Sequence, residues 1–285
     1  MTLEYWYMLP VGTLVATVAM AAGVGGATFF SPLFILALGL SPEVAIGTGL
    51  ITEVFGFASG VYAYAHKRLI DYRLGVTLLI VTVPAAIFGT WVSGRADPDV
   101  LKVILGAGLF AVAASFLRAP ERKDVLRMDK AIDEEYGGAK AETCLKSATG
   151  ENICYTVCNK YEGRAIAGIG GLFVGMISTG LGELNQYFLL QRCRVPSRVS
   201  VATSVFVVAV TALTAAGGHL FQFMRTGGDV MDTVLSIVIF TVPGVIIGAQ
   251  LGSAVSGRIS EHTTERVLGV LFAIVALLTI GEVVL

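Results

Sequence analysis

A glycine-broken apolar segment occurs twice in this chain, and this feature most restricts what the chain can fold into. Gly23-Val24-Gly25-Gly26 interrupts the first long apolar run, and Gly180-Leu181-Gly182 interrupts another run about 157 positions further on. Backbone that leaves a helix inside a bilayer must be covered by protein or line a wet cavity. The two breaks therefore predict a site within the protein rather than a surface in contact with lipid.

Further landmarks follow each break in the same order. An apolar stretch comes first, and then a proline (Pro42, Pro196) and a threonine that opens the next apolar segment (Thr48, Thr203). The sequence Thr-Val-Pro recurs at 82–84 and 241–243, and Leu-Gly recurs at 105–106 and 268–269. Duplicated membrane halves with broken segments in corresponding places are typical of secondary transporters.

The distribution of charge indicates a polytopic membrane protein. Of the 285 residues, 55% are hydrophobic and only 14% are charged, whereas a soluble domain carries about 25% charged residues. The charges gather in loops, above all between Leu117 and Arg164. We therefore expect the lipid bilayer as a partner and the cytoplasmic membrane as the location. The formal net charge of -1 provides no basic field for nucleic acid.

Hydropathy predicts an all-α integral membrane protein with eight apolar segments. They cover approximately 8–38, 44–65, 74–94, 99–118, 165–190, 199–221, 230–255 and 264–284. We expect a first membrane repeat at 1–118, a soluble connecting segment at 119–163 and a second repeat at 164–285. The first segment of each repeat is either a broken span or two half-helices that enter and turn back.

The orientation of the chain in the membrane depends on whether each first segment crosses the bilayer or turns back. If the first segment is one span, the loop at 66–73 shares a side with the connecting segment and both termini, and the excess of Lys and Arg makes that side cytoplasmic. Arg192, Arg194 and Arg198 then form a basic rim on the opposite side. An odd number of spans in each half would invert one half relative to the other.

The residue pattern of the connecting segment predicts an amphipathic helix over 121–136 and a short hairpin over 143–157, with its turn at 149–152. Cys144, Cys154 and Cys158 lie in this segment, and Cys193 lies beyond it. Their spacing is not a standard zinc pattern. They could bind a metal or form a disulfide across the hairpin, and a structural role is favoured.

The breaks suggest an anion site. A broken helix exposes the first N–H groups of its second part, and these groups with the helix dipole attract an anion. Close helix packing through small residues is the alternative explanation for the glycines. The candidate substrate-binding residues are Gly23, Gly25, Gly26, Thr28, Ser31, Thr48, Thr179, Gly180, Gly182, Asn185, Gln186 and Thr203, and Ser178 is a further hydroxyl nearby.

Two carboxylates fall inside apolar segments, and a charge at that depth is costly. Glu53 lies in the middle of the second segment, and Glu183 directly follows the second break. Either could be a proton-coupling residue, or each could make a static polar contact. His219 ends the sixth segment. An interfacial position is favoured for His219 over a role as a proton relay.

Around these landmarks the chain resembles the TauE/SafE family of sulfite exporters, also called the toluene-sulfonate uptake permease family. The matching elements are Gly23-Val24-Gly25-Gly26 with Ser31-Pro32-Leu33, Leu40-Ser41-Pro42 and Gly47-Thr48, and in the second half Gly180-Leu181-Gly182, Val195-Pro196 and Ala202-Thr203-Ser204. Glu183-Leu184-Asn185 stands where glycines are typical of the family. The resemblance implies transport of sulfite, sulfonates or related anions across the cytoplasmic membrane.

We therefore predict a secondary transporter for a small sulfur oxyanion or organosulfonate, with export favoured and proton coupling open. No catalytic triad, nucleotide-binding loop or cofactor motif is present in the sequence, so we expect neither an enzyme nor a bound cofactor. One rival is an anion channel of the same fold. Another is a membrane redox or metal protein that uses the loop cysteines. Assembly into a homo-oligomer stays open.

Overall fold

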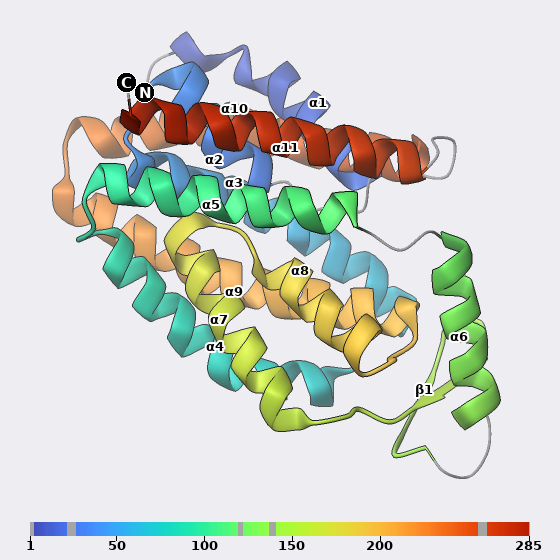
Figure 1. Ribbon diagram of the computed structural model, residues 1–285. Coiled ribbons are helices and arrows are strands. Elements are labelled where there is room, and N and C mark those ends of the chain that lie inside the picture. Colours follow the sequence, from blue (N-terminus) through green and yellow to red (C-terminus); the bar gives the residue numbers. More distant parts are fainter. Residues whose placement is uncertain (1–2, 22–26, 119–121, 137–140, 256–260, 285) are drawn as a thin grey trace.

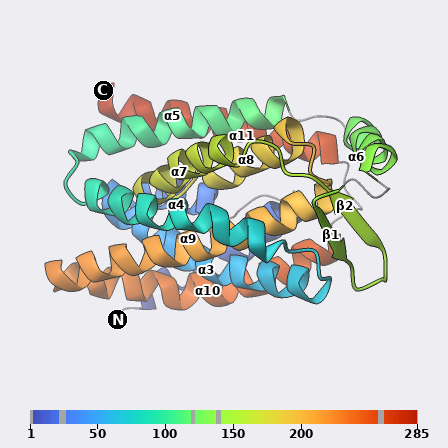
Figure 2. The ribbon, with the colours of Figure 1, turned by 90° about the horizontal axis from the view of Figure 1, so that it is seen from below.

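The protein is a bundle of helices along one common axis, with a short helix and two strands at one end (Figures 1 and 2). The computed structural model describes residues 3–21, 27–118, 122–136, 141–255 and 261–284. Within these ranges, five helices are long and apolar enough to cross a membrane. They are α3 (Pro42–His66), α4 (Tyr72–Ser93), α5 (Pro98–Leu117), α9 (Ser197–Thr226) and α10 (Asp229–Val255). The predicted all-α membrane fold is confirmed.

The first apolar run is divided into a short 3-10 turn η1 (Leu3–Tyr5), α1 (Met8–Ala21) and α2 (Ala27–Leu38). α1 runs parallel to α10, because Gly12 faces Thr241 while Ala16, one turn later, faces Gly248. α2 runs antiparallel to α3, since Ser31 lies beside Gly49 and a short turn joins the two helices. We call α1 and α2 the first hairpin.

The second broken segment also turns back. α7 (Lys160–Ile177) is followed by α8 (Leu181–Gln186) and a π-helix, η2 (Tyr187–Arg192). Gly170 contacts Leu181 and Gly163 contacts Phe188, so the two legs are antiparallel. A disulfide between Cys158 and Cys193 joins the legs at their base. We call this unit, residues 158–193, the second hairpin.

The helices pack crosswise between the two repeats. α1 packs on α10, and α7 packs on α4 in the same parallel manner. Thr52 and Thr241 share a hydrogen bond of 3.0 Å, and Thr82 and Thr211 share one of 2.9 Å. Each threonine of one contact has a counterpart in the other contact that is 159 positions away, since Thr52 corresponds to Thr211 and Thr82 corresponds to Thr241. This recurrence supports two inverted repeats, although the boundaries at 118 and 164 stay a prediction.

Two helix pairs complete the bundle. α5 packs antiparallel to α11 (Glu261–Val284), where Gly106 faces Ile280 and Gly269 faces Leu117. α3 packs antiparallel to α9, and Gly47 there meets the side chain of Phe223. Because a glycine has no Cβ, Gly106 and Gly269 also lie close to backbone carbonyls of the partner helix, as is common in membrane helices. Gly47 instead leaves room for the Phe223 ring.

The segment between α5 and α7 carries one helix and two strands. It contains α6 (Arg122–Tyr136) and an antiparallel hairpin of β1 (Thr143–Lys146) and β2 (Asn152–Tyr155). Cys144 lies opposite Cys154, and the two form a disulfide. The β-hairpin docks where α3 ends and α4 begins, because Ala148 N–H donates to the Lys67 carbonyl at 3.0 Å. Figure 2 shows α6 and both strands at this one end of the bundle.

The sequence-based assignment of sides was wrong in two respects. Arg192 bonds to Glu162 at 3.0 Å and Arg198 bonds to Glu151 at 3.1 Å, so the basic rim lies at the same end as the connecting segment. α1 begins and α11 ends at the opposite end (Figure 1). The physical reason is that both broken segments turn back, and each therefore adds no crossing.

Candidate substrate site at the two chain breaks

The tip of the second hairpin meets the first hairpin inside the bundle. Ser178 Oγ and Ser31 Oγ share a hydrogen bond of 2.6 Å between residues that are 147 positions apart, and both side chains are buried. Gly49 on α3 and Gly108 on α5 face this contact: a Cβ at Gly49 would lie 2.7 Å from Ser31 Oγ, and one at Gly108 would meet Ile177. The second break therefore lies against the first turns of α2.

The turn at the second break follows from its backbone. Ser178 is the C-cap of α7 in the left-handed conformation (φ 60°), and its N–H donates to Val174 O at 3.0 Å. Gly180 has a φ of 105°, which a residue with a Cβ adopts only with strain. The N–H of Leu184 then donates to Gly180 O at 3.1 Å and begins α8.

Close packing does not explain Gly182. A Cβ at this position would have Val208 Cγ2 as its nearest neighbour, at 3.9 Å, which is an ordinary contact. Gly182 O instead accepts a hydrogen bond from Ser204 Oγ at 3.4 Å. The packing alternative fits helix-interior glycines such as Gly171 and Gly175, which lie against the backbone of α4.

Two polar side chains beside α8 have unmet hydrogen-bonding capacity. Asn185 is 1% exposed, and its Nδ2 makes no hydrogen bond within the described residues. Ser200 is completely buried, and its Oγ is likewise without a partner there. Ser200 lies one turn before Ser204 on α9. Buried polar groups are nearly always hydrogen-bonded, so this region can accommodate a polar ligand.

His219 is fully buried, which contradicts the interfacial position favoured from the sequence. Its Nε2 lies 3.0 Å from Gly175 O. This carbonyl belongs to the last turn of α7, where carbonyls lack partners within the helix. Because the carbonyl can only accept, we assign the proton to Nε2. His219 therefore caps the helix that ends at the break.

The structure places the predicted site residues in three groups. Ser31 lies near the start of α2, and the residues at or directly after the turn that follows α7 are Thr179, Gly180, Gly182, Asn185 and Gln186. Thr48 is buried on α3 and donates to Val44 O at 2.7 Å. Thr203 lies apart from the tip, because its Oγ1 accepts the Asp71 N–H at 3.0 Å beside the connecting segment.

The remaining predicted residues are described less fully. Glu53 is buried in α3, next to Thr52, which bonds to Thr241. Thr28 and Glu183 lie on α2 and α8, but their side chains are outside the described part of the structure. Gly23, Gly25 and Gly26 lie outside the described residues altogether.

Sequence reasoning did not include Ser204, Gly49 or Gly108 among the site residues. Ser200 and Ser204 are spaced by four on an otherwise apolar helix, and this spacing was the available signal for a polar face on α9. Nothing in the sequence alone pairs Gly49 or Gly108 with the breaks, because those contacts depend on how the hairpins turn.

All four cysteines are paired in two disulfides. A metal site built from them would require both bonds to be reduced first. Within the described ranges, no group of three or more His, Cys, Asp or Glu side chains is placed to hold a metal ion. The polar side chains described at and after the second break include the hydroxyl of Ser178 and the amide of Asn185.

Comparison with known proteins agrees with a membrane transport function. The family described as "Sulfite exporter TauE/SafE" matches residues 8–279. The probable membrane transporter protein YunE of Bacillus subtilis is 23% identical over 287 residues and covers 98% of both chains. YjnA, a second probable membrane transporter protein of that organism, is 26% identical and covers 87% of this chain and 90% of its own. No solved structure matches the chain.

The match extends over nearly the whole chain, from α1 to α11, and includes both hairpins. The apolar helices and the family agree that this is a multi-pass membrane protein of a transporter class. The chain belongs to the sulfite exporter TauE/SafE family.

Proposed function

We propose that the protein is a secondary transporter that moves a small sulfur oxyanion or organosulfonate across the cytoplasmic membrane, with export favoured by its family. The observation that carries this proposal is the buried contact between Ser31 on α2 and Ser178 at the turn that follows α7. Substrate sites of secondary transporters are commonly built from such discontinuous helices near the middle of the membrane.

The proposed substrate site uses neutral donors. Ser31, Ser178 and Thr179 provide hydroxyls, Asn185 provides an amide N–H without a partner in the described residues, and the turn at Gly180 provides backbone N–H groups. Neutral donors bind an oxyanion without a fixed counter-charge, which favours release after transport. Thr48 and Thr203 are the proposed residues with the least support, because both are used in local hydrogen bonds.

Proton coupling is assigned to Glu53 and Glu183. Glu53 is buried on α3, and Glu183 lies on α8 directly after Gly182. A carboxyl group that exchanges a proton during the cycle would link anion movement to the proton gradient. Exposure would alternate by movement of one repeat against the other.

The test is flux in proteoliposomes loaded with sulfite, sulfoacetate or thiosulfate, with and without a pH gradient. We expect saturable flux for at least one anion, and we expect Gly182→Leu to abolish it while the protein still folds. Gly217→Leu is the matched control, because a Cβ at Gly217 has no neighbour within 4 Å and the residue is exposed. Flux no greater than in empty vesicles for all three anions would reject the substrate class.

The same vesicles test coupling. Glu53→Gln or Glu183→Gln should remove the dependence of flux on the pH gradient. Flux that never saturates, and that is unchanged in both variants, would instead indicate a channel.

A further inference from the structure

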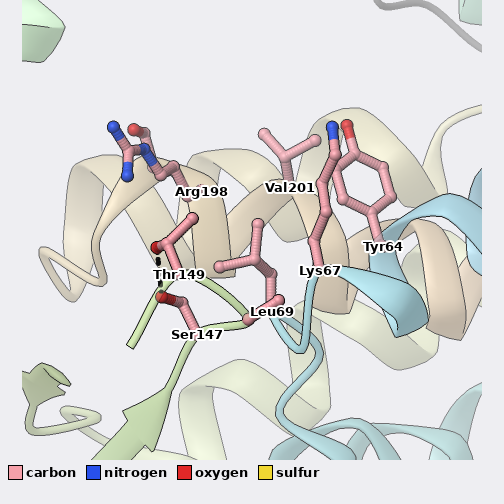
Figure 3. A pocket seen from close by; sticks show the side chains of 9 residues that line it. Tyr64, Lys67, Leu69, Ser147, Thr149, Arg198 and Val201 are labelled. Atoms are coloured by element: carbon pink, nitrogen blue, oxygen red, sulfur yellow. Dashed lines mark hydrogen bonds between the residues drawn. The ribbon is translucent and has the colours of Figure 1, made fainter. Parts of the chain in front are cut away.

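A cavity of about 540 Å³ opens at the end of the bundle that carries the connecting segment (Figure 3). Its walls come from the turn after α3, the tip of the β1–β2 hairpin and the first turns of α9. The Ala148 N–H bond to Lys67 O holds the β-hairpin against the α3 turn. The volume of the cavity is within the range of about 300–1,000 Å³ that is usual for small-molecule sites. We call this cavity the end pocket.

The end pocket has two cations on opposite sides. Figure 3 shows Arg198 on one side and Lys67 on the other, with the hydroxyls of Ser147 and Thr149 nearer to Arg198. The two hydroxyls share a hydrogen bond of 2.8 Å. Lys67 makes no ion pair with the described residues, and its ammonium lies 5.9 Å from the centre of the Tyr64 ring.

In the part of the chain that the structure describes, the acidic side chains of Glu151 and Asp129 adjoin the pocket, and both have partners. Glu151 Oε2 accepts from Arg198 Nη1 at 3.1 Å, in a pair that is largely exposed to solvent. Asp129 accepts from both the N–H and the hydroxyl of Ser197. An exposed ion pair contributes little stability, so an incoming anion can compete with Glu151 for Arg198. Among the described residues, no acidic side chain is paired with Lys67.

The floor and one wall of the pocket are apolar. Leu69 is 8% exposed and lies between the two cations in Figure 3, with Val201 above it. The Tyr64 ring lies next to Lys67. A bare inorganic oxyanion would contact the cations but leave this surface uncovered. An organic molecule with a single oxyanion head and an apolar body would place its head near the cations and cover the apolar surface with its body.

We propose that the end pocket binds an organic monoanion, with its head between Lys67 and Arg198 and its body on Leu69 and Val201. This site is separate from the hairpin tip. Ser197 and Ser204 lie on one face of α9, seven residues apart, which is about 10 Å along a helix. The pocket therefore lies outward of the Ser204–Gly182 contact, on the same helix face.

The test measures binding of benzenesulfonate to the full-length protein in phosphatidylcholine nanodiscs by isothermal titration calorimetry. We expect a saturable site whose affinity falls with added salt and which is kept in Gly182→Leu, the variant that removes the proposed transport site. Lys67→Gln and Arg198→Gln should each weaken binding about tenfold, as expected for the loss of a charge-assisted hydrogen bond. Sulfate and benzyl alcohol, which carry the head or the body alone, should bind far more weakly.

Glu151→Gln provides an effect of opposite sign. It releases Arg198 from its partner, so binding should tighten about twofold to fivefold. Lys130→Gln is the matched control, because Lys130 is an exposed cation of α6 that pairs with Glu134. Absence of saturable binding in the unmodified protein, equal binding in the double variant of Lys67 and Arg198, or weaker binding in Glu151→Gln would overturn the proposal.

Anionic lipid has the same combination of head and body, and a second set of nanodiscs separates the two sources. One outcome would identify a lipid as the occupant. Phosphatidylglycerol discs would abolish benzenesulfonate binding, and native mass spectrometry would find the lipid on the unmodified protein but not on the double variant. The proposal of a soluble anion would then be wrong. Gly182→Leu should keep benzenesulfonate binding while it loses flux. Failure of the end pocket and failure of the transport function are thereby distinguishable.

Discussion

At the scale of single residues, Asp71 connects three distant parts of the chain. Its Oδ1 accepts the Leu74 N–H at 3.0 Å and caps α4, its Oδ2 accepts the Tyr155 hydroxyl at 2.7 Å, and its own N–H donates to Thr203. Asp71 and Tyr155 are both buried. Burial, with the hydrogen bond to Asp71, raises the pKa of the Tyr155 hydroxyl above its ordinary value. The connecting segment is thus attached through a buried polar contact.

Tyr155→Phe should lower the free energy of unfolding by about 1–3 kcal/mol, because it leaves the buried Asp71 Oδ2 without this donor. The measurement is thermal unfolding of the purified protein, with Tyr161→Phe as control because Tyr161 is 81% exposed. Since the pKa of Tyr155 is raised in the folded state, the difference should be complete below pH 10 and shrink at higher pH. Equal losses in both variants would show that the contact with Asp71 is not responsible.

At the scale of elements, the closest helix contacts depend on glycines that face backbone carbonyls. Gly175 on α7 lies against the Ala86 carbonyl of α4, and Gly248 on α10 lies against the Thr13 carbonyl of α1. A carbonyl of a helix backbone cannot move aside as the end of a flexible side chain can. These glycines therefore set how closely α7 approaches α4 and α1 approaches α10.

Gly175→Ala should force α7 away from α4 and lower the free energy of unfolding by about 1–3 kcal/mol, the usual cost of overpacking. Gly217→Ala on α9 is the control, because its Cβ meets nothing within 4 Å, and it should be neutral or slightly stabilising. Size-exclusion profiles and melting temperatures of both variants in detergent provide the comparison. A stable Gly175→Ala protein with an unchanged melting temperature would contradict the packing described here.

The sequence was sufficient to predict most elements but not the direction of the broken ones. Apolar runs and the glycines locate α3, α4 and α5, yet hydropathy is the same whether a broken segment crosses or returns. The return at the second break depends on the left-handed conformation of Ser178, which composition does not specify. The disulfide partner of Cys158 was not predicted either, because Cys193 lies 35 residues away on the other leg.

The candidate site was predicted only in part, because the contacts between its residues depend on how the broken segments turn. Ser31, Ser178 and Gly180 flank breaks that are visible in the sequence, and the structure brings them together. Thr203 was chosen because it matches Thr48 in the repeat, but the contact it makes depends on the connecting segment, which has no counterpart in the repeat.

At the scale of the whole molecule, the two reversals concentrate basic residues at one end. Lys67, Arg192 and Arg198 lie beside the connecting segment, as their contacts with it or with the base of α7 show. In the described ranges, the opposite end carries Arg95, Lys102 and Arg225, near the α4–α5 and α9–α10 turns. Short loops rich in Lys and Arg lie on the cytoplasmic side of membrane proteins.

We therefore predict that the connecting segment faces the cytoplasm and the α4–α5 turn faces outward. In a background with all four cysteines replaced by serine, Lys130→Cys should react with a membrane-impermeant maleimide only after the cells are permeabilised. Arg95→Cys should react in intact cells. The reverse labelling pattern would place the connecting segment outside.

The disulfide at the base of the second hairpin makes the two hairpins mechanically unequal. Cysteine is absent from the sequence between 1 and 118, so the first hairpin has no such covalent bond. With Cys158 and Cys193 linked, the second hairpin is restricted to tilting as a unit, whereas α1 and α2 are free to separate. We expect the first hairpin to undergo the larger displacement in each transport cycle. We also expect the thiol–disulfide balance of the compartment to decide whether the legs of the second hairpin can separate.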